Sequence, residues 1–297
     1  MHVFIGFLSL LGYFLNTVLW VTPILLLSVF KLVPFKIWQT GIAYLLDGCA
    51  TAWISFNNIN QNVFSRTIFR VSGTQALTPK DWYLVISNHR SWVDILVLQR
   101  IFNRKIPFLK FFLKRELIWV PLLGLAWWAL DFPFMRRYSK AFLAKYPHLK
   151  GKDLEATRQA CEKFRFKPVS IMNFVEGTRF TQQKNQVQQA PYQHLLNPKA
   201  GGVAFVLGAM GDKLHKLLDV TIYYPQGTPS FWQFVCGKVR QINVKVKVFS
   251  IEELVKNDVF SAEYFDNPAQ RERFQQWLTA LWQQKDQDIK TLKMAKL

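Results

Sequence analysis

The chain of 297 residues is both basic and apolar: 38 Lys and Arg stand against 19 Asp and Glu, and 50% of the residues are hydrophobic. The aromatic content of 15% excludes a disordered basic tail, and the lack of a heptad or Gly-X-Y repeat excludes a coiled coil and collagen. A formal net charge of +19 on a folded chain predicts a polyanionic partner, either nucleic acid or anionic lipid and phosphorylated substrates.

The first thirty residues contain no Lys, Arg, Asp or Glu. At about 20 residues per span, this run suffices for one tilted transmembrane helix, or Pro23 breaks it into two helices of a membrane-embedded hairpin. A cleaved signal peptide is the competing interpretation. It requires a positive amino-terminal region and a small-residue cleavage site, which are both missing, so an uncleaved anchor is favoured. Lys31 and Lys36 follow the run and predict that the remainder lies on the cytoplasmic side.

A second apolar stretch, residues 37–56, contains Asp47 and two glycines. We interpret it as a helix packed on the membrane or on the first segment. The expected organisation is therefore a membrane-anchoring helical segment over residues 1–60 and a catalytic domain over residues 61–297. Cys49, Cys161 and Cys236 are too widely spaced for a disulfide framework or a zinc site, so we expect a reducing compartment and no bound metal.

Beyond residue 60, predicted strands alternate with predicted helices. This order indicates an α/β fold with a mostly parallel sheet flanked by helices, in which ligands bind at the carboxyl ends of strands. The last strand alternates polar and apolar residues, which suggests a half-exposed strand at an edge. The last helix has an apolar face that we expect to dock on the core. The strands are expected at Thr67–Val71, Trp82–Ser87, Val169–Val175, Val220–Tyr224 and Val239–Phe249, and the helices at Ser91–Phe102, Leu154–Phe164, Gly202–Leu218 and Pro268–Gln283.

Basic residues are concentrated in two blocks, residues 66–115 and 136–167, and between them the stretch 117–130 is uncharged and rich in tryptophan. The basic blocks form a solvated face or lie on anionic headgroups. The uncharged stretch is too short to span a bilayer, so it is either a buried core helix or a hydrophobic surface that receives an acyl chain.

The sequence S-N-H-R-S-W-V-D, residues 87–94, follows a predicted strand and precedes a predicted helix. A carboxylate five residues after a histidine can fix the imidazole tautomer, so that His89 acts as a general base supported by Asp94. No nucleophilic residue of the protein is needed if the substrate supplies a hydroxyl. The alternative is structural, because Ser91 and Asp94 also fit a helix capping box.

A second strand end carries N-F-V-E-G-T-R, residues 173–179. Glycine allows a close backbone approach there, and Arg179 can form forked hydrogen bonds to phosphate oxygens. The alternative is an ordinary turn with a solvated arginine.

Together, the H-x-x-x-x-D and E-G-T-R motifs resemble the glycerolipid acyltransferase family, which comprises 1-acylglycerol-3-phosphate acyltransferases and related lysophospholipid acyltransferases. The resemblance covers roughly Thr67 to Pro225 and is nearest to a bacterial inner-membrane branch. Further similar segments are K-R-E-L at 114–117, F-P-F-M-R-R at 132–137, N-P-K-A-G-G at 197–202 and Y-Y-P at 223–225.

This resemblance implies a membrane-bound enzyme that transfers a fatty acyl group from acyl-CoA or acyl carrier protein to a lysophospholipid hydroxyl, most simply converting 1-acylglycerol-3-phosphate to phosphatidic acid. His89 would deprotonate the hydroxyl, Asp94 would orient His89, and backbone amides near residues 88–92 would form an oxyanion hole. The acyl donor is a substrate, so no cofactor is implied. The residues implied to bind the acceptor and its phosphate are Glu176, Gly177, Thr178, Arg179, Arg137, Lys114 and Lys199.

The resemblance also separates the candidate partners. It implies an anionic membrane lipid surface, a lysophospholipid and an acyl donor, with a bacterial inner membrane as the location. Reacylation of another lysophospholipid, such as lysophosphatidylglycerol, and a non-catalytic membrane-surface binder are the alternatives. Nucleic acid is not expected, because no zinc-finger, RRM or basic-zipper signature is present.

Overall fold

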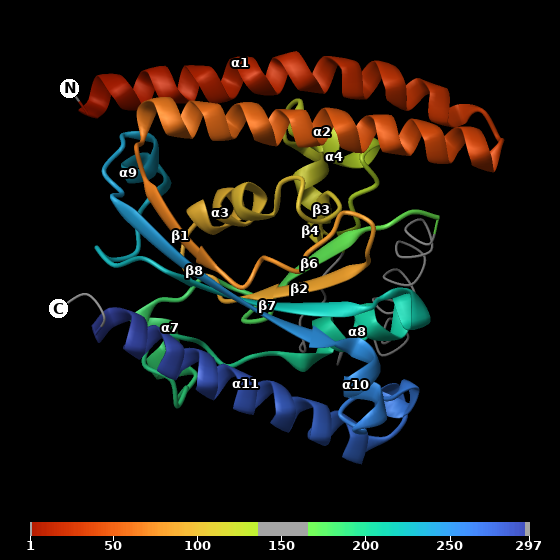
Figure 1. Cartoon of the computed structure of the whole chain (residues 1–297), viewed down its shortest axis with the longest axis vertical. Helices are drawn as coiled ribbons and strands as arrows, with labels where there is room; N and C mark the ends of the chain where they lie inside the picture. The colour runs from red at the N-terminus through yellow and green to blue at the C-terminus, as the bar shows by residue number, and fades with distance from the viewer. Residues whose placement is uncertain (1, 136–165, 295–297) are drawn as a thin grey trace.

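A mixed β-sheet lies at the centre of the computed structural model, which describes residues 2–135 and 166–294 (Figure 1). Within these residues the sheet has six strands in the order β1-β8-β7-β2-β6-β3, and all neighbours are parallel except β7 and β8. This arrangement confirms the expected, mostly parallel sheet. The strands are β1 (Ile68–Ser72), β2 (Tyr83–Ser87), β3 (Leu109–Phe111), β6 (Ser170–Phe174), β7 (Lys216–Tyr223) and β8 (Gln241–Ser250); β4 (Leu113–Lys114) and β5 (Phe134–Met135) form a separate pair.

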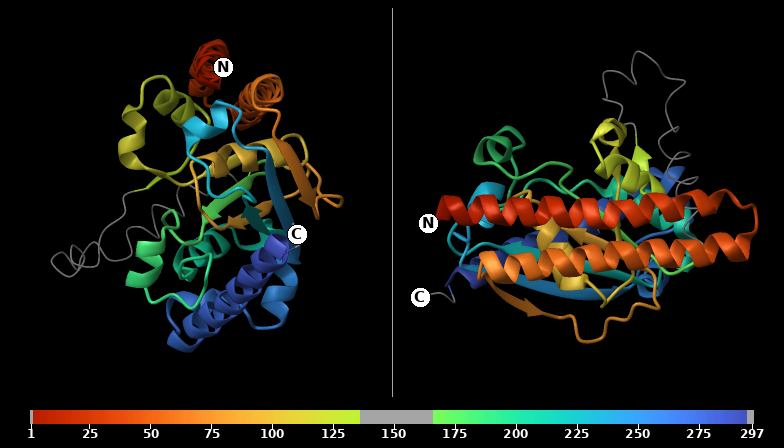
Figure 2. Two further views of the ribbon diagram at one scale, coloured as in Figure 1. Left: turned by 90° about the vertical axis from the view of Figure 1, so that its left-hand side faces the viewer. Right: turned by 90° about the horizontal axis from the view of Figure 1, so that it is seen from above.

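Helices cover both faces of the sheet (Figures 1 and 2). The alternation along β2 shows why two layers are needed: Tyr83 and Val85 belong to one apolar cluster, whereas Leu84 and Ile86 belong to the other. One face carries α1 (His2–Val29), η1 (Phe30–Leu32), α2 (Lys36–Phe64), α3 (Val93–Phe102), η2 (Arg115–Trp119), α4 (Leu123–Ala129) and α9 (Phe231–Val235). The other carries α7 (Gln182–Val187), α8 (Ala200–Met210), η4 (Gly211–Lys213), α10 (Ile251–Lys256), η5 (Ala262–Phe265) and α11 (Pro268–Met294).

Helices α1 and α2 lie side by side as an antiparallel hairpin along one face of the molecule (Figures 1 and 2). Their polar side chains face each other: Asn16 donates to Asn57 Oδ1 at 2.8 Å, and Asn60 donates to the carbonyl of Ser9 at 3.1 Å. Pro23 lies inside α1 and does not divide it, so of the two alternatives for this segment the break at Pro23 is wrong. The chain turns instead at residues 30–35, between the two long helices.

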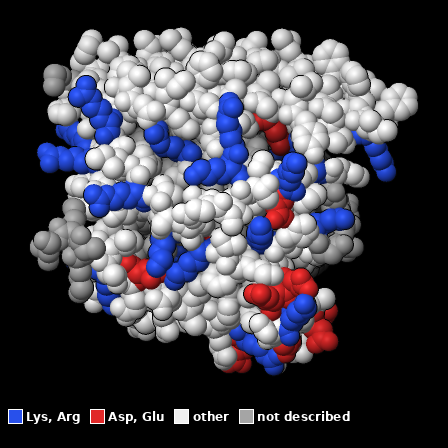
Figure 3. All heavy atoms as spheres, in the orientation of Figure 1, with Lys and Arg blue, Asp and Glu red and all other residues white. Residues whose placement is uncertain are grey.

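The outer side of α1 is apolar and exposed; Phe4, Phe7 and Phe14 are 67%, 62% and 58% accessible. The uppermost band of the space-filling view, over α1, is free of charged side chains, and Lys and Arg lie below it (Figure 3). By length and composition, residues 2–32 suffice to cross a membrane, a test that signal sequences and core helices also pass. The hairpin contributes to the core of the domain, since Ile42, Leu46 and Ile54 of α2 are buried in the apolar cluster that also contains Tyr83 and Val85 of β2. The expected division after residue 60 stays a prediction; α2 continues to Phe64.

Two sequence-based expectations about the C-terminal half are wrong. The helix expected over Gly202–Leu218 ends at Met210, because Gly211 has a φ of +52° and the chain continues into β7. The strand expected at an edge, β8, lies between β1 and β7. Its polar row is explained by α11, since Lys245 and Lys247 form ion pairs with Asp288 at 3.2 and 2.7 Å.

Other expectations are resolved more simply. Helix α11 docks on the core as predicted, with Phe274, Leu278 and Trp282 fully buried. In the stretch 117–130, Ala126 and Ala129 are buried, as expected of a core helix, while Trp119, Leu125 and Trp128 are exposed. That this exposed apolar surface receives an acyl chain stays a prediction. The helix expected at Leu154–Phe164 lies outside the described residues.

Candidate active site

The loop after β2 places His89 at the carboxyl end of the central strands. The side-chain amide of Asn88 bonds both backbone groups of Ile222 at 2.9 Å, which ties the start of the loop to β7. His89 Nδ1 lies 2.9 Å from Asp94 Oδ2, and the imidazole stacks on Phe174 with ring centroids 3.9 Å apart. These contacts fix the plane of the imidazole, and an Nδ1–H donated to Asp94 leaves Nε2 as the proton acceptor.

Asp94 is fully buried and accepts hydrogen bonds on both carboxylate oxygens. Oδ2 accepts from the backbone N–H of Arg90 at 2.6 Å and of Ser91 at 2.9 Å, and Oδ1 accepts from the Tyr224 hydroxyl at 2.5 Å. Asp94 therefore reaches back to the helix start, as in capping, and contacts His89 at the same time. Two of the amides expected in an oxyanion hole, those of Arg90 and Ser91, already donate to Asp94.

The loop after β6 brings the second motif to the first. Gly177 adopts a φ of +69°, and its amide donates to Phe174 at 2.9 Å, closing a tight turn. The backbone N–H of Phe180 then donates to the carbonyl of His89 at 2.7 Å. On the outside, the guanidinium of Arg179 lies 4.6 Å from the ring centroid of Trp92. The two motifs thus form one site, although about eighty residues separate them.

Glu176 differs from its neighbours, because its carboxyl group is fully buried. Among the residues that the structure describes, neither of its oxygens has a hydrogen-bond partner of regular geometry. Burial raises the pKa of Glu176 to about 8, against the opposing effects of the Leu196 and His89 backbone amides and of the charges on Lys285 and Arg90. A buried side chain of this kind supports the loop from beneath and does not project to the surface.

Two lysines lie beside the turn of the second motif. Lys199 is exposed and lies against Gly177, where a Cβ would come within 3.3 Å of its ammonium. Lys184, which the sequence did not single out, donates to Thr178 Oγ1 at 2.8 Å and to the carbonyl of Arg179 at 3.1 Å. Such ammonium and guanidinium groups suit a phosphate-bearing substrate.

Arg90 is a second cation that sequence reasoning missed. Its guanidinium donates to Thr228 Oγ1 at 3.1 Å and lies 4.9 Å from the ring centroid of Phe180. The position directly after the histidine of the first motif was its only signal in the sequence.

Of the two other predicted phosphate ligands, Lys114 and Arg137, the structure describes only the first. Lys114 is exposed on β4, and no contact with His89 or Asp94 joins it within the described residues. Arg137 lies outside the described residues. In the described part of the chain, no group of three or more His, Cys, Asp or Glu side chains could hold a metal ion.

An ion pair beneath the site was also missed by sequence reasoning. Lys285 of α11 and Asp219 of β7 are both buried, with Nζ and Oδ1 2.5 Å apart, and Lys285 also donates to the carbonyl of Val220 at 2.6 Å. The positive charge of Lys285 lowers the pKa of Glu176. The available signals were an aspartate inside the apolar strand Lys216–Tyr223 and a lysine next to the apolar face of the last helix.

The site thus consists of an imidazole–carboxylate pair beside a glycine turn and an arginine, at the carboxyl ends of parallel strands. This arrangement is that of an acyltransferase-like site. The chain belongs to the Acyltransferase family, whose sequence profile matches residues 68–225 and so includes both motifs.

Several individual proteins resemble the chain. It is 25% identical over 231 residues to the 1-acyl-sn-glycerol-3-phosphate acyltransferase gamma of Mus musculus, covering 74% of this chain and 56% of that protein. It is 25% identical over 204 residues to the 1-acyl-sn-glycerol-3-phosphate acyltransferase 3 of Arabidopsis thaliana, covering 62% of this chain and 50% of that protein. The chain thus spans about half the length of these curated relatives.

The fold is also found in a solved structure. The crystal structure of the 1-acyl-sn-glycerophosphate (LPA) acyltransferase PlsC from Thermotoga maritima matches with a TM-score of 0.54. The match covers 98% of both chains at 16% sequence identity, so it supports the α/β fold and its N-terminal helices and not a particular substrate.

Proposed function

We propose that this protein is a membrane-bound O-acyltransferase that converts 1-acylglycerol-3-phosphate to phosphatidic acid, with acyl-CoA or acyl carrier protein as the acyl donor. The observation that carries the proposal is the junction of the two motifs, in which Asp94 holds His89 and Phe180 bonds the His89 carbonyl. The identity of the acceptor is inferred from the similar proteins, whose names state 1-acyl-sn-glycerol-3-phosphate as the acceptor.

In the proposed reaction, Nε2 of His89 removes the proton from the acceptor hydroxyl as the hydroxyl oxygen attacks the thioester carbonyl carbon. The new C–O bond forms and the C–S bond breaks, so no acyl-enzyme is needed. The imidazolium then returns its proton to the departing thiolate, and His89 ends in its starting state. Asp94 stabilises the imidazolium between these steps through its negative charge.

The acceptor phosphate binds at the mouth, where Arg179 is the first candidate ligand. Thr178 and Lys199 border the same turn, and Glu176 and Gly177 give the turn its shape. Lys114 and Arg137 remain candidate phosphate ligands from the resemblance.

Membrane attachment is proposed through the hairpin of α1 and α2. The exposed apolar side of α1 lies in the plane of one leaflet, because the polar side chains of α1 are engaged by α2. The catalytic domain then lies on the cytoplasmic face of a bacterial inner membrane.

Acyl transfer by purified protein tests the reaction. Lysophosphatidic acid and lysophosphatidylglycerol are each paired with acyl-CoA and with acyl carrier protein. We expect phosphatidic acid as the main product and no product from His89→Ala, with unchanged thermal unfolding. Full activity of His89→Ala would refute the mechanism. Lysophosphatidylglycerol as the preferred acceptor would favour reacylation.

The second candidate function is a non-catalytic binder of membrane surfaces. The exposed apolar hairpin favours it, and the absence of transfer with every acceptor and both donors would select it. The His89–Asp94 contact argues against it, since binding a membrane needs no general base.

A further inference from the structure

An exposed tryptophan lies on the loop that carries His89. Trp92 comes three residues after His89, at the N-cap position of α3, and is 56% accessible. Its neighbour Val93 is fully buried and belongs to an apolar cluster, whereas Trp92 belongs to neither of the two clusters. Burial in the core therefore does not explain a tryptophan at this position.

The backbone on both sides of Trp92 is fixed by hydrogen bonds. The Ser91 hydroxyl donates to the carbonyl of Pro229 at 2.6 Å and accepts from the N–H of Val93 at 3.1 Å. The N–H of Ser91 donates to Asp94 Oδ2 at 2.9 Å. The indole ring is therefore attached to a rigid segment, and only its own side-chain torsions are free to vary.

The ring of Trp92 contacts a cation from the second motif. The guanidinium of Arg179 lies 4.6 Å from the ring centroid, which is within the range of an attractive cation–π contact. The backbone of Arg179 is also held, because its carbonyl accepts from Lys184 at 3.1 Å and the next N–H, of Phe180, donates to the carbonyl of His89 at 2.7 Å. The ring and the guanidinium thus meet between two loops that are already joined.

The guanidinium of Arg179 keeps its hydrogen-bond donors free. In the part of the chain that the structure describes, no oxygen accepts a hydrogen bond from it and no carboxylate pairs with it. The contact with Trp92 is not a hydrogen bond, and a guanidinium that lies on a ring keeps its N–H groups in its own plane. Arg179 can therefore remain on the ring and bind phosphate oxygens along its edge.

Arg90 shows the reciprocal contact with a different outcome. Its guanidinium lies 4.9 Å from the ring centroid of Phe180, so each loop sends an arginine to an aromatic ring of the other. Arg90, however, donates from Nε to Thr228 at 3.1 Å and to the carbonyl of His194 at 3.4 Å. Arg90 thus braces the loops, whereas Arg179 remains available to a ligand.

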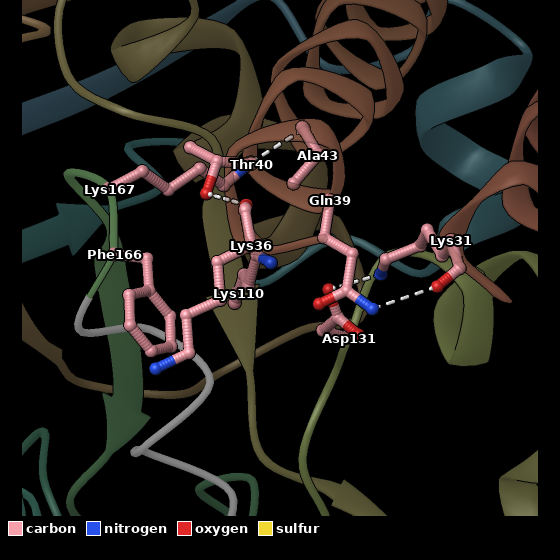
Figure 4. A pocket seen from close by; sticks show the side chains of 9 residues that line it. All are labelled: Lys31, Lys36, Gln39, Thr40, Ala43, Lys110, Asp131, Phe166 and Lys167. Carbon is pink, nitrogen blue, oxygen red and sulfur yellow. Dashed lines mark hydrogen bonds and ion pairs between the residues drawn. The ribbon is translucent and has the colours of Figure 1, made fainter. Parts of the chain in front are cut away.

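The basic pocket at the turn of the hairpin also differs from this arrangement (Figure 4). Its volume is about 280 Å³, and its lysines are Lys31, Lys36, Lys110 and Lys167. Lys31 pairs with Asp131 at 2.5 Å. Lys167 pairs with Asp47 at 2.6 Å. Two of these ammonium groups are therefore engaged by carboxylates, whereas within the described residues none engages Arg179.

The contact with Trp92 prepares Arg179 for binding. An exposed arginine samples many rotamers, and the freedom that it loses on binding weakens the affinity for its ligand. The ring restricts these rotamers before the substrate arrives, so a larger fraction of the protein is ready to bind. Because Trp92 and His89 lie on one loop, the same contact also sets where a bound phosphate lies relative to the general base.

We propose that Trp92 is a positioning residue for the acceptor phosphate: its indole ring holds the guanidinium of Arg179 so that the N–H donors face the phosphate of the lysophospholipid. Trp92 thereby favours an acceptor that carries its phosphate close to the reacting hydroxyl. The inference rests on the proposed function, in which Arg179 binds that phosphate.

Transfer kinetics of the full chain in detergent micelles test the role of the ring. A cation–π contact corresponds to about twofold to thirtyfold in affinity. Trp92→Leu should raise the KM for lysophosphatidic acid within this range and change kcat by less than about twofold, as expected when binding alone is lost. Trp92→Phe keeps an aromatic face and should lie between the parent and Trp92→Leu. The control Trp232→Leu removes a 40% accessible tryptophan of α9 whose ring contacts Phe7, and it should behave as the parent does.

Three results would overturn the proposal. An unchanged KM for Trp92→Leu would show that the ring is not needed. A lower KM would show that the ring holds Arg179 away from the phosphate. A loss confined to kcat, with normal thermal unfolding, would show that Trp92 supports the loop of His89 instead.

A double-mutant cycle separates action through Arg179 from any other use of the ring. If Trp92 acts through the guanidinium, Trp92→Leu should raise KM no further once Arg179→Ala is present. Additive effects of the two changes would refute the proposal, and they are what insertion of the ring into a membrane or micelle would produce.

Equilibrium binding of lysophosphatidic acid without an acyl donor keeps this inference apart from the proposed reaction. If the parent binds it, Trp92→Leu binds it more weakly and no transfer occurs with either donor, only the proposed reaction fails. If the parent transfers acyl groups but the cycle is additive, only the role of Trp92 fails. If the parent neither binds lysophosphatidic acid nor transfers to it, both proposals fail.

Discussion

Replacing Asp94 by asparagine measures what its charge contributes, because the surrounding hydrogen bonds fix how the new amide must lie. Two backbone N–H groups, from Arg90 and Ser91, donate to the Oδ2 position, so the asparagine carbonyl must take that place. Its NH₂ then faces the Tyr224 hydroxyl, which can turn to accept a hydrogen bond. His89 Nδ1–H keeps its acceptor, and the charge alone is lost.

The size of the effect follows from the geometry of the ion pair that forms during the reaction. With Nδ1 and Oδ2 2.9 Å apart, the charge centres of imidazolium and carboxylate lie about 4 Å apart. At an effective dielectric constant of about 20, their attraction is about 4 kcal/mol. We therefore expect kcat to fall roughly 10³-fold for Asp94→Asn, since each 1.4 kcal/mol of barrier is about tenfold in rate.

Initial rates of transfer to lysophosphatidic acid across a pH series measure this effect. KM should change little, because the charge of Asp94 acts on the imidazolium that forms in the transfer step. Asp266→Asn, an exposed substitution at the end of η5, serves as the control and should behave as the parent does. A loss of less than tenfold would refute the role of Asp94, and a rate as low as that of His89→Ala would refute the orientation argued for the amide.

Three further changes test other parts of the structure. Glu176→Gln should stabilise the protein at high pH. Because the pKa of the Glu176 carboxyl is raised from 4.5 to about 8, the parent loses stability as pH rises between these values, by at most about 5 kcal/mol. In urea unfolding, parent and variant should therefore agree near pH 4, diverge as pH rises to 8, and differ by a constant amount above it. Tyr224→Phe removes one of the donors to Asp94 and should lower kcat by about tenfold or less with the fold intact; an unchanged kcat would contradict a supporting role. The double variant Phe4→Ser, Phe14→Ser should release the protein from vesicles, because each phenylalanine side chain contributes about 1.5–3 kcal/mol when buried in the membrane. The control Val187→Ser, on α7, should stay bound. If the parent, the double variant and the control are retained equally in a flotation assay, insertion of α1 is excluded.

The parts of the fold that depend on local pattern could be predicted from the sequence. The run Tyr83–Ser87 is apolar as far as Ile86 and buried at every position, as a central parallel strand must be, and the predicted strand agrees with it to within one residue. The His89–Asp94 contact was also predictable, because a short loop and the first turn of α3 hold both residues. Two local signals conflict at Gly211. The apolar run predicts that the helix continues to Leu218, whereas the glycine predicts that it ends, and the structure agrees with the glycine.

Features that join distant segments could not be predicted in this way. Tyr224 reaches Asp94 across 130 residues, and the polar row of β8 indicated an edge strand only because its partner, Asp288, is supplied by the last helix. Alternation reports that one face of a strand is polar, but it does not say whether water or an ion pair satisfies that face. The same limit applies to Lys110, whose short strand carries no pattern and whose surroundings come from the hairpin turn and from residues beyond α4. The composition gives the amounts of charged and apolar residues separately. The positions at which charged and apolar side chains come together are determined by the packing of segments that are remote in the sequence. The candidate active site at the carboxyl ends of the strands is one such position, because the backbone N–H of Phe180 joins the second motif to the carbonyl of His89.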